Sequence, residues 1–332
     1  MLQVANKSPF VPLVSVLADE TGVETLYVVV RGTFDLAPNP KAAEQQLPPA
    51  AGDVYWGDPA TSSLKYASEI HVGKRGTDVV LLGHAYPPGG RPVPEMLVAL
   101  NVAGRQKVVR VIGDRTWHTV MGGFTHPEPF AKMPLVYERS FGGRHDDGKG
   151  RVSAEERNPV GTGFRGRRSL GEAGTCKVPN LEDPRRLLKG FGDQPPPAGF
   201  GFVAPSWQPR RAFAGTYDHN WQKDRAPYLP KDFDCRFDNA ATPDLVFDPF
   251  LVGGEPLIIT GLSPEGTLRL AIPTAKPSVR VTIAGKRERP PVQLETVLIE
   301  PDERRLCLTW RAALACDKRA LKIQSVTIEG GA

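Results

Sequence analysis

The chain is poor in the residues that build disulfides and metal sites. Its 332 residues include four cysteines, far apart and with no C-x-x-C pair, at Cys176, Cys235, Cys307 and Cys316. We expect neither a zinc knuckle nor a disulfide framework, but reduced and mostly buried thiols. The six histidines form no HExxH or HxH arrangement, so we expect no metal site and no cofactor. No serine lies in a G-x-S-x-G elbow, and nothing commits the protein to catalysis.

Long apolar runs are also missing. No uninterrupted apolar stretch of about 18 residues is present for a membrane span. The opening residues MLQVANKSPFVPLVS lack a basic start followed by an apolar run, so we expect no secretory signal and a cytoplasmic protein without membrane insertion. The net charge of +5 is spread along the chain rather than clustered, which argues against a nucleic-acid partner.

Glycine and proline, in contrast, are abundant, with 34 and 33 residues. Together they exceed the average share of a globular protein, which indicates many turns, long loops and little helix. We expect one short helix at most within 180–191, where Pro184 suits the first turn and Gly190 the end.

Strand-forming runs lie towards both ends of the chain. In the first half, β-branched and aromatic residues predict strands at 26–34, 79–85, 96–102 and 107–112, the last two as a hairpin closed by a Gly-containing loop. The C-terminal strands are predicted at 257–260, 268–272, 279–283, 292–299, 306–310 and 321–328. Their short length and regular spacing are typical of a sandwich or barrel rather than of a parallel sheet with crossover helices.

The sequence therefore predicts a mostly β fold of two antiparallel β-sandwich-like units joined by a long, irregular middle region rich in Gly and Pro. We expect an N-terminal β unit at 1–137 and a C-terminal sandwich-like unit at 251–332. The middle, 138–250, holds a Gly- and Arg-rich loop, a proline spacer and a stretch rich in Asp and aromatic residues. Few apolar side chains occur at 138–178, so we expect this part to be the least protected in the isolated protein.

The stretch from Tyr217 to Phe250 interleaves seven aspartates with aromatic rings. Its four prolines predict an extended, turn-rich path, neither a regular helix nor a simple strand, pinned by aromatic anchors and Asx-turns. Its residues suit either a structural loop or a recognition surface. We expect Trp221 and Phe233 to be buried, with Arg225 and the flanking aspartates partly accessible.

Two glycine-rich motifs match nucleotide-binding loops only superficially. The motif at 143–150 has Gly where a P-loop needs Ser or Thr, two aspartates where the phosphates would lie, and no preceding strand. The motif at 161–166 lacks both the strand before it and the helix after it. We expect no nucleotide site at either place.

Several separated stretches together resemble one family. They are VVVRGTFDL at 28–36, YERSFGG at 137–143, NPVGTGF at 158–164, PNLEDP at 179–184 and WQKDRAPYLPKDFDCRFDNAATPD at 221–244. In this order, over nearly the whole chain, they resemble an uncharacterised-domain family of type VI secretion accessory proteins in Gram-negative bacteria. The resemblance implies a cytoplasmic, non-enzymatic adaptor or chaperone. Its implied partners are a toxic effector, often with a PAAR tip domain, and the VgrG spike onto which the effector is loaded.

The candidate site residues come from these motifs and from the Gly- and Arg-rich loop. The partner-binding candidates are Trp221, Arg225, Asp232, Asp234, Arg236, Asn239, Arg139, Arg144, Asn158 and Arg165. The expected structural anchors are Phe233, Phe237, Phe141, Gly142 and Gly143. Aromatic rings and Arg are the residue types that interfaces use as anchors.

Two alternatives stay open on the residues alone. One is a hydrolase or carbohydrate-processing enzyme in which Asp232, Asp234 and His219 line a pocket with convergent, pKa-perturbed groups. The other is a carbohydrate-binding β-sandwich that stacks sugars on Trp207 and Trp221.

Overall fold

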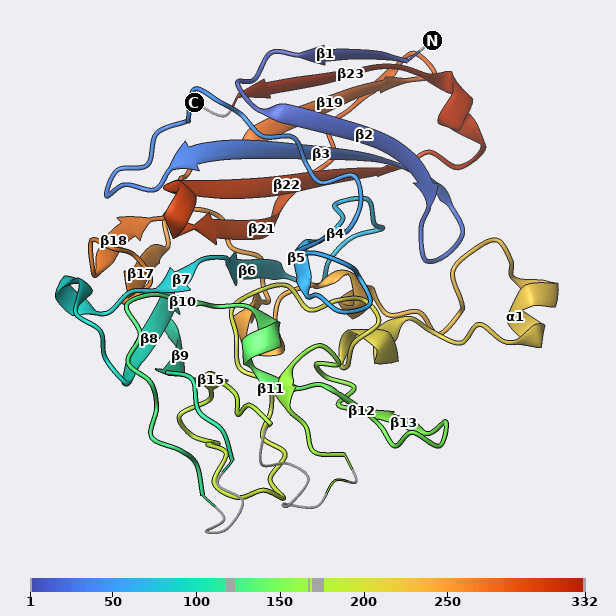
Figure 1. Ribbon diagram of the computed structural model, residues 1–332. Helices are drawn as coiled ribbons and strands as arrows, with labels where there is room; N and C mark the ends of the chain where they lie inside the picture. Colours follow the sequence, from blue (N-terminus) through green and yellow to red (C-terminus); the bar gives the residue numbers. More distant parts are fainter. Residues whose placement is uncertain (1, 118–122, 167, 169–175, 331–332) are drawn as a thin grey trace.

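The computed structural model describes residues 2–117, 123–166, 168 and 176–330 (Figure 1). The prediction of a mostly β fold is confirmed, and within these ranges α1 (His219–Asp224) is the single α-helix. Short 3₁₀ segments are η1 (Pro88–Gly90), η2 (Tyr137–Arg139), η3 (Arg210–Phe213), η4 (Cys235–Asp238), η5 (Pro243–Leu245), η6 (Pro301–Glu303) and η7 (Asp317–Lys322).

A central six-stranded sheet has the order β16–β6–β21–β22–β3–β2. Its strands are β2 (Val11–Ala18), β3 (Glu24–Asp35), β6 (Thr77–Leu81), β16 (Val246–Phe247), β21 (Val292–Glu300) and β22 (Arg305–Ala315). All neighbours are antiparallel except β6 and β21, which are parallel. β3 is buried from Thr25 to Phe34, as its run of β-branched and aromatic residues predicts for a strand packed on both faces.

Two further sheets complete the β scaffold. The five-stranded sheet, of order β15–β9–β8–β17–β18, contains β8 (Glu95–Val102), β9 (Arg105–Ile112), β15 (Leu181–Glu182), β17 (Pro256–Thr260) and β18 (Leu268–Ala271). The four-stranded sheet, of order β1–β23–β19–β20, contains β1 (Gln3–Asn6), β19 (Pro277–Ile283), β20 (Lys286–Glu288) and β23 (Ile323–Gly330). One cluster of buried apolar side chains, including Val30, Leu100 and Val281, joins all three sheets.

The sheets combine the two end regions of the chain, which were predicted to form separate units. β3 from the N-terminal region pairs with β22, and β8 pairs with β17. The positions of strand-forming runs were predicted well, because burial and β-branching are local signals. Which run pairs with which depends on contacts distant in sequence, so the predicted boundaries at 137 and 250 do not separate the sheets.

In the middle region, 138–250, short ladders pair β11 (Phe141–Gly142) with β14 (Thr162–Gly163) and β12 (Arg144–Asp146) with β13 (Val152–Ala154). Similar short ladders before residue 138 pair β4 (Val54–Tyr55) with β5 (Leu64–Tyr66) and β7 (His84–Ala85) with β10 (Met133–Pro134). Residues 167 and 169–175 of the predicted least protected part lie outside the described residues. Its low protection stays a prediction.

The helix predicted within 180–191 is absent. Leu181 and Glu182 instead form β15, which pairs with Val111 and Arg110 of β9. Glu182 is buried and ion-paired with Arg115, so this segment is held by sheet pairing and a buried charge pair. These tertiary contacts outweigh the weak local preference for a helix.

Candidate functional site

Residues 213–237, the arm, project from the side of the molecule with α1 at the outer end (Figure 1). Its two ends are tied together at the body. The backbone N–H of Asp234 donates to the Phe213 carbonyl at 3.1 Å, and the Arg236 guanidinium lies 4.2 Å from the centre of the Phe213 ring. Phe233 packs edge-on against Phe237 in the same base, with ring centres 6.0 Å apart. The arm is therefore a loop with a fixed base rather than a free linker.

α1 forms within a stretch that was predicted to hold no regular helix. Asp218 caps it, because its Oδ1 accepts the backbone N–H of Trp221 at 2.8 Å. The Trp221 ring packs edge-on against Tyr217 at 4.7 Å between centroids, and its indole N–H donates to the Tyr228 carbonyl at 2.8 Å. So short a helix is marginal alone, and these side-chain contacts stabilise it.

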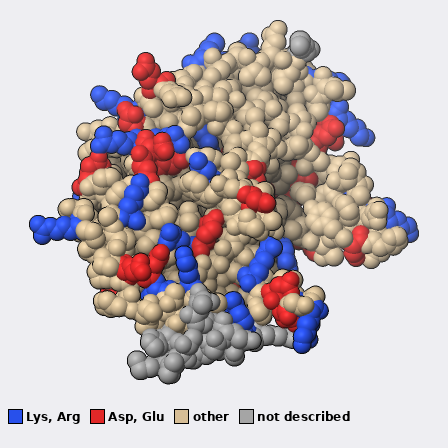
Figure 2. Space-filling view, viewed as in Figure 1, with Lys and Arg blue, Asp and Glu red and all other residues tan. Residues whose placement is uncertain are grey.

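The arm exposes aromatic surface. Tyr217 is 54% exposed and Tyr228 is 43% exposed. Trp221 and Phe233 are half-buried, so the expectation that both are buried is wrong. Because the arm stands away from the sheets, its rings are covered mainly by one another. On the face seen in Figure 2, the arm is largely uncharged, with charged side chains near its outer end.

Arg225 positions the arm on the body. Its guanidinium donates to the carbonyls of Leu229 and Glu20, both at 2.8 Å, and it lies 5.7 Å from the centre of the Tyr228 ring. Glu20 belongs to the turn between β2 and β3, where Gly22 has a φ of 91° and lies against Tyr228. Arg225 thus joins the arm to the edge of the central sheet.

The two predicted aspartates of the arm have local partners. Asp232 accepts hydrogen bonds from the backbone N–H and the hydroxyl of Thr216, which hold its pKa below the ordinary value. Asp234 is ion-paired with Arg236 at 2.6 Å, and the hydrogen bond from that guanidinium lowers the pKa of Asp234.

A shallow hollow of about 250 Å³ on the arm brings three partner-binding candidates together. Trp221, Arg225 and Asp232 all line it. Asp234 and His219 do not line it, and His219 is exposed on α1. The trio expected for a hydrolase is therefore not assembled around this hollow.

The arginine candidates outside the arm lie on other elements. Arg139 donates to Asp114 at 3.2 Å and Asn180 at 3.0 Å, Arg165 lies 5.5 Å from the centre of the Phe191 ring, and Arg144 is exposed on β12. Among the described residues, none of their hydrogen bonds, ion pairs or ring contacts reaches the arm.

Two partner-binding candidates are interior residues. Asn158 is fully buried and its amide donates to the carbonyls of Tyr137 at 2.8 Å and Phe141 at 3.0 Å. Asn239 is 5% exposed and bonded to the segment that begins β6. Both residues stabilise the fold, so their assignment to a partner surface is wrong. A short polar side chain can hydrogen-bond to a buried backbone group as well as to a partner protein.

The anchor candidates Phe141, Gly142 and Gly143 are also buried. A Cβ on Gly142 would lie 2.1 Å from the Asn158 carbonyl oxygen, and the φ of this glycine is 155°. Only glycine allows the backbone to pass this close.

A buried network of charged groups lies where the arm joins the body, next to Asp238, and was not predicted from the sequence. Its members come from β3, β6, β21, β22 and the segments next to them. They are Arg31, Glu69, His71, Lys74, Asp78, Asp238, Glu295 and Arg311. These residues are far apart in the sequence, so no local motif could predict that they meet.

The network connects the residues that follow the arm, Asn239 and Ala240, to the central sheet. Asp78 accepts the Lys74 ammonium at 2.9 Å, the Asn239 amide at 2.9 Å and the backbone N–H of Ala240 at 2.8 Å. Burial raises the pKa of Asp238, one of whose carboxylate oxygens is buried without a hydrogen bond. The arm thus continues directly into the buried charge network.

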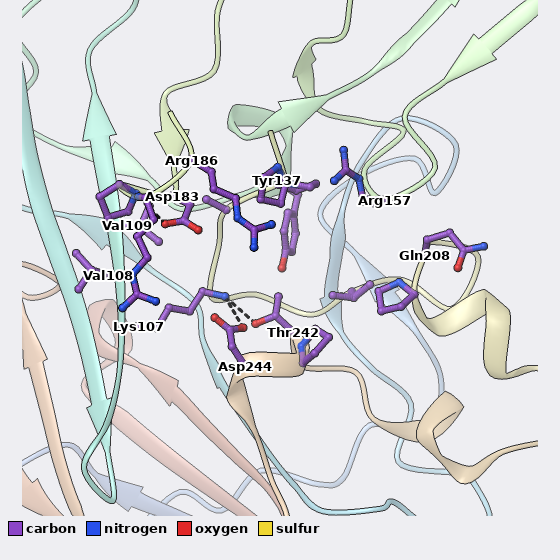
Figure 3. Close-up of a pocket in the computed structure, with 18 of the residues that line it drawn as sticks. Lys107, Val108, Val109, Tyr137, Arg157, Asp183, Arg186, Gln208, Thr242 and Asp244 are labelled. Carbon is purple, nitrogen blue, oxygen red and sulfur yellow. Dashed lines mark hydrogen bonds and ion pairs between the residues drawn. The ribbon is translucent and has the colours of Figure 1, made fainter. Parts of the chain in front are cut away.

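A cavity of about 780 Å³ opens beside β9 (Figure 3). Its walls come from β9, η5 and the proline-containing loops that follow β15. Lys107 extends into it from β9, and its ammonium donates to Thr242 Oγ1 at 2.8 Å and Asp244 Oδ1 at 2.9 Å. Burial lowers the pKa of Lys107, although Asp244 opposes this shift.

Trp207 cannot serve as an open stacking platform. It is 4% exposed and packs edge-on against Tyr137 at 5.6 Å between centroids. Of the two tryptophans expected to stack sugars, only Trp221 has part of its surface exposed.

A family model described as an uncharacterized protein conserved in bacteria (DUF2169) matches residues 21–311. The chain belongs to this family. The match spans the arm, the buried charge network and the cavity of this DUF2169 protein. Searches of curated proteins and of solved structures found no match.

Metal-holding clusters and membrane-spanning helices are both missing from the described residues of this DUF2169 protein. In the described ranges, no group of three or more His, Cys, Asp or Glu residues is arranged to hold a metal ion. The same ranges contain no helix with the length and apolar character that a membrane crossing requires.

Proposed function

We propose that this DUF2169 protein is a cytoplasmic, non-enzymatic adaptor of a type VI secretion system. It helps to load a toxic effector, in many cases one that contains a PAAR domain, onto the VgrG spike. The proposal combines the motif resemblance, which runs over nearly the whole chain, with the form of the arm. Membership in the DUF2169 family is compatible with it and names no function.

The exposed aromatic group on the arm carries the proposal. Trp221 lines a hollow together with Arg225 and Asp232. The exposed ring of Tyr217 packs edge-on against Trp221, and the backbone carbonyl of the exposed Tyr228 accepts the indole N–H of Trp221. Aromatic residues beside Arg are the commonest anchors of protein interfaces, because they bury much area and lose little conformational entropy. The hollow of about 250 Å³ is smaller than the usual pocket for a small-molecule substrate.

The fixed base suits the arm to binding. The contacts of Phe213 with Asp234 and Arg236 and the bond from Arg225 to Glu20 hold the arm in one position. Less conformational freedom is then lost when a partner binds, which favours affinity.

Affinity purification from a strain with an active type VI system tests this function. Tagged wild-type protein is expected to copurify with an effector or a VgrG or PAAR protein, identified by mass spectrometry. The double variant Tyr217→Ala, Tyr228→Ala removes two exposed rings and should lower the recovered partner at least tenfold. Its free energy of unfolding should stay within about 1 kcal/mol of wild type, because exposed side chains contribute little to stability.

A matched control removes two exposed apolar side chains elsewhere. Val252 is 72% exposed and Leu321 is 100% exposed, and neither belongs to the arm. The variant Val252→Ser, Leu321→Ser should recover as much partner as wild type. Absence of effector and spike proteins from the wild-type sample, or full recovery with the arm variant, would contradict the proposal.

A further inference from the structure

The hairpin of β8 and β9 determines which backbone groups of β9 face outward. Ala103 and Gly104 form its turn with φ values of 50° and 82°, the two positive values of a type I′ turn. Val102 and Arg105 close this turn and exchange hydrogen bonds, and the pattern then alternates along the ladder. The N–H and C=O groups of Gln106 and Val108 therefore point away from β8.

This outer edge of β9 is covered at only one end. β15 pairs with β9 at Arg110 and Val111, and the next position of β15 towards Val108 would be occupied by Pro184 after Asp183. Proline has no N–H to donate, so the ladder ends there. In the described part of the chain, no hydrogen bond satisfies the outward backbone groups of Gln106 and Val108.

The open edge lines the cavity of about 780 Å³, a volume within the usual range of ligand pockets. Gln106, Lys107, Val108 and Val109 all contribute to its wall. An exposed row of backbone donors and acceptors recognises another backbone, which adds as a strand. The chemistry of this wall therefore selects an extended peptide.

The charges around the cavity select the side chains of that peptide. Lys107 is paired with Asp244, and Arg157 is paired with Glu155 at 2.6 Å. Arg186 has an exposed guanidinium that makes no ion pair with any described residue, and Figure 3 shows it extending into the cavity towards Tyr137.

Arg185 and Asp183, which are neighbours of Arg186, also contribute to the charge of the cavity wall. Arg185 is also exposed and without an ion pair among the described residues, and the carboxylate of Asp183, which also faces the cavity, accepts the backbone N–H of Arg185 at 2.9 Å. The two unpaired guanidinium groups against this one carboxylate leave a net positive charge.

We propose that the cavity binds an extended, acidic segment of a partner polypeptide. The segment adds to the free edge of β9 as a short strand in line with β15, exchanging backbone hydrogen bonds with Val108, and it places a carboxylate on Arg186. The inference rests on this cavity alone and does not depend on the adaptor function of the arm.

Fluorescence polarisation with synthetic peptides tests this site on the full-length protein. The probe is a fluorescein-labelled, amide-capped octapeptide of alternating Glu and Val, and the matched probe carries Lys in place of Glu. The Glu probe should bind with a Kd at least tenfold lower than the Lys probe. Methylation of the backbone nitrogens of the Glu probe should weaken binding at least tenfold, because a strand needs those donors.

Two variants separate charge from strand pairing. Arg186→Glu should raise the Kd of the Glu probe at least tenfold. Val108→Pro removes an outward N–H without breaking a bond to β8 and should have a similar effect, with its fold checked by circular dichroism. Arg269→Glu, at the opposite edge of the same sheet on β18, is the charge control and should bind like wild type.

Three results of the peptide experiment would contradict strand addition at β9. Absence of Glu-probe binding at protein concentrations up to about 1 mM would overturn the inference. Equal binding of the Glu and Lys probes, or of the methylated probe, would also overturn it. The variant Tyr217→Ala, Tyr228→Ala should bind the Glu probe normally, which keeps this test distinct from that of the adaptor function.

Discussion

Replacing Asn239 by Leu should destabilise the whole protein rather than a partner surface. The Asn239 amide donates to the Gly76 carbonyl and to Asp78 Oδ1, both at 2.9 Å, and its Oδ1 accepts the backbone N–H of Arg75 at 3.0 Å. Leu has a similar volume and none of these polar atoms, so the substitution removes hydrogen bonds without leaving a large cavity.

The loss of stability depends on which hydrogen bonds the former partners of Asn239 still make in the variant. Asp78 retains Lys74 and the Ala240 N–H, so it loses only part of its bonding. The Gly76 carbonyl is buried and loses its amide partner, which costs about 1–3 kcal/mol. The Arg75 N–H is partly accessible to water and adds less. We expect a loss of about 2–4 kcal/mol, a large part of the stability of an average domain.

Urea unfolding followed by tryptophan fluorescence measures this loss. Asn220, exposed on α1, is the matched control, and Asn220→Leu should change the free energy of unfolding by less than about 0.5 kcal/mol. If Asn239→Leu unfolds within 0.5 kcal/mol of wild type and instead loses partner binding, the reasoning that moved this residue from the partner surface to the interior is refuted.

Three further predictions concern the network, the Gly142 contact and the arm. Burial raises the pKa values of Glu69 and Glu295, but nearby cations, above all Lys74 for Glu69 and Arg311 for Glu295, outweigh burial and hold both pKa values below the ordinary 4.5. The stabilisation by these two carboxylates is therefore present above that pH and is lost as the pH falls below it. Glu295→Gln should flatten the fall in unfolding free energy that urea titrations measure as the pH is lowered from about 5. Gly142→Ala should cost about 1–3 kcal/mol in the same assay, whereas Gly52→Ala, where a Cβ meets nothing within 4 Å, should be neutral; equal stability of the two variants would contradict the close contact. Arg225→Ala should speed tryptic cleavage within the arm several-fold while global stability stays within about 1 kcal/mol, and an unchanged cleavage rate would show that Arg225 does not hold the arm.

Local signals predicted the scaffold and missed how its parts assemble. The run at 26–34 and the hairpin at 96–112 are strands because β-branching, burial and turn chemistry act between near neighbours. The predicted helix at 180–191 failed because pairing with β9, a contact distant in sequence, decided that segment.

The candidate site was likewise predicted where local sequence signals define it and mispredicted where distant contacts do. The aromatic and Asp-rich stretch was recognised as a unit, and Trp221, Arg225 and Asp232 do meet on the arm. Asn158 and Asn239 were misassigned because sequence does not distinguish a polar side chain that faces a buried carbonyl from one that faces a partner. The cavity beside β9 is built from segments far apart in the chain, and no single motif marks it.

Site-specific photo-crosslinking tests the central claim most directly. A benzophenone side chain at Tyr217 or Tyr228 in cells with an active type VI system should crosslink to an effector, VgrG or PAAR protein, whereas the same group at Leu321 should not. Crosslinks from Leu321 but not from the arm, or only to proteins unrelated to that secretion system, would contradict the assignment of this DUF2169 protein as an effector-loading adaptor that binds through its arm.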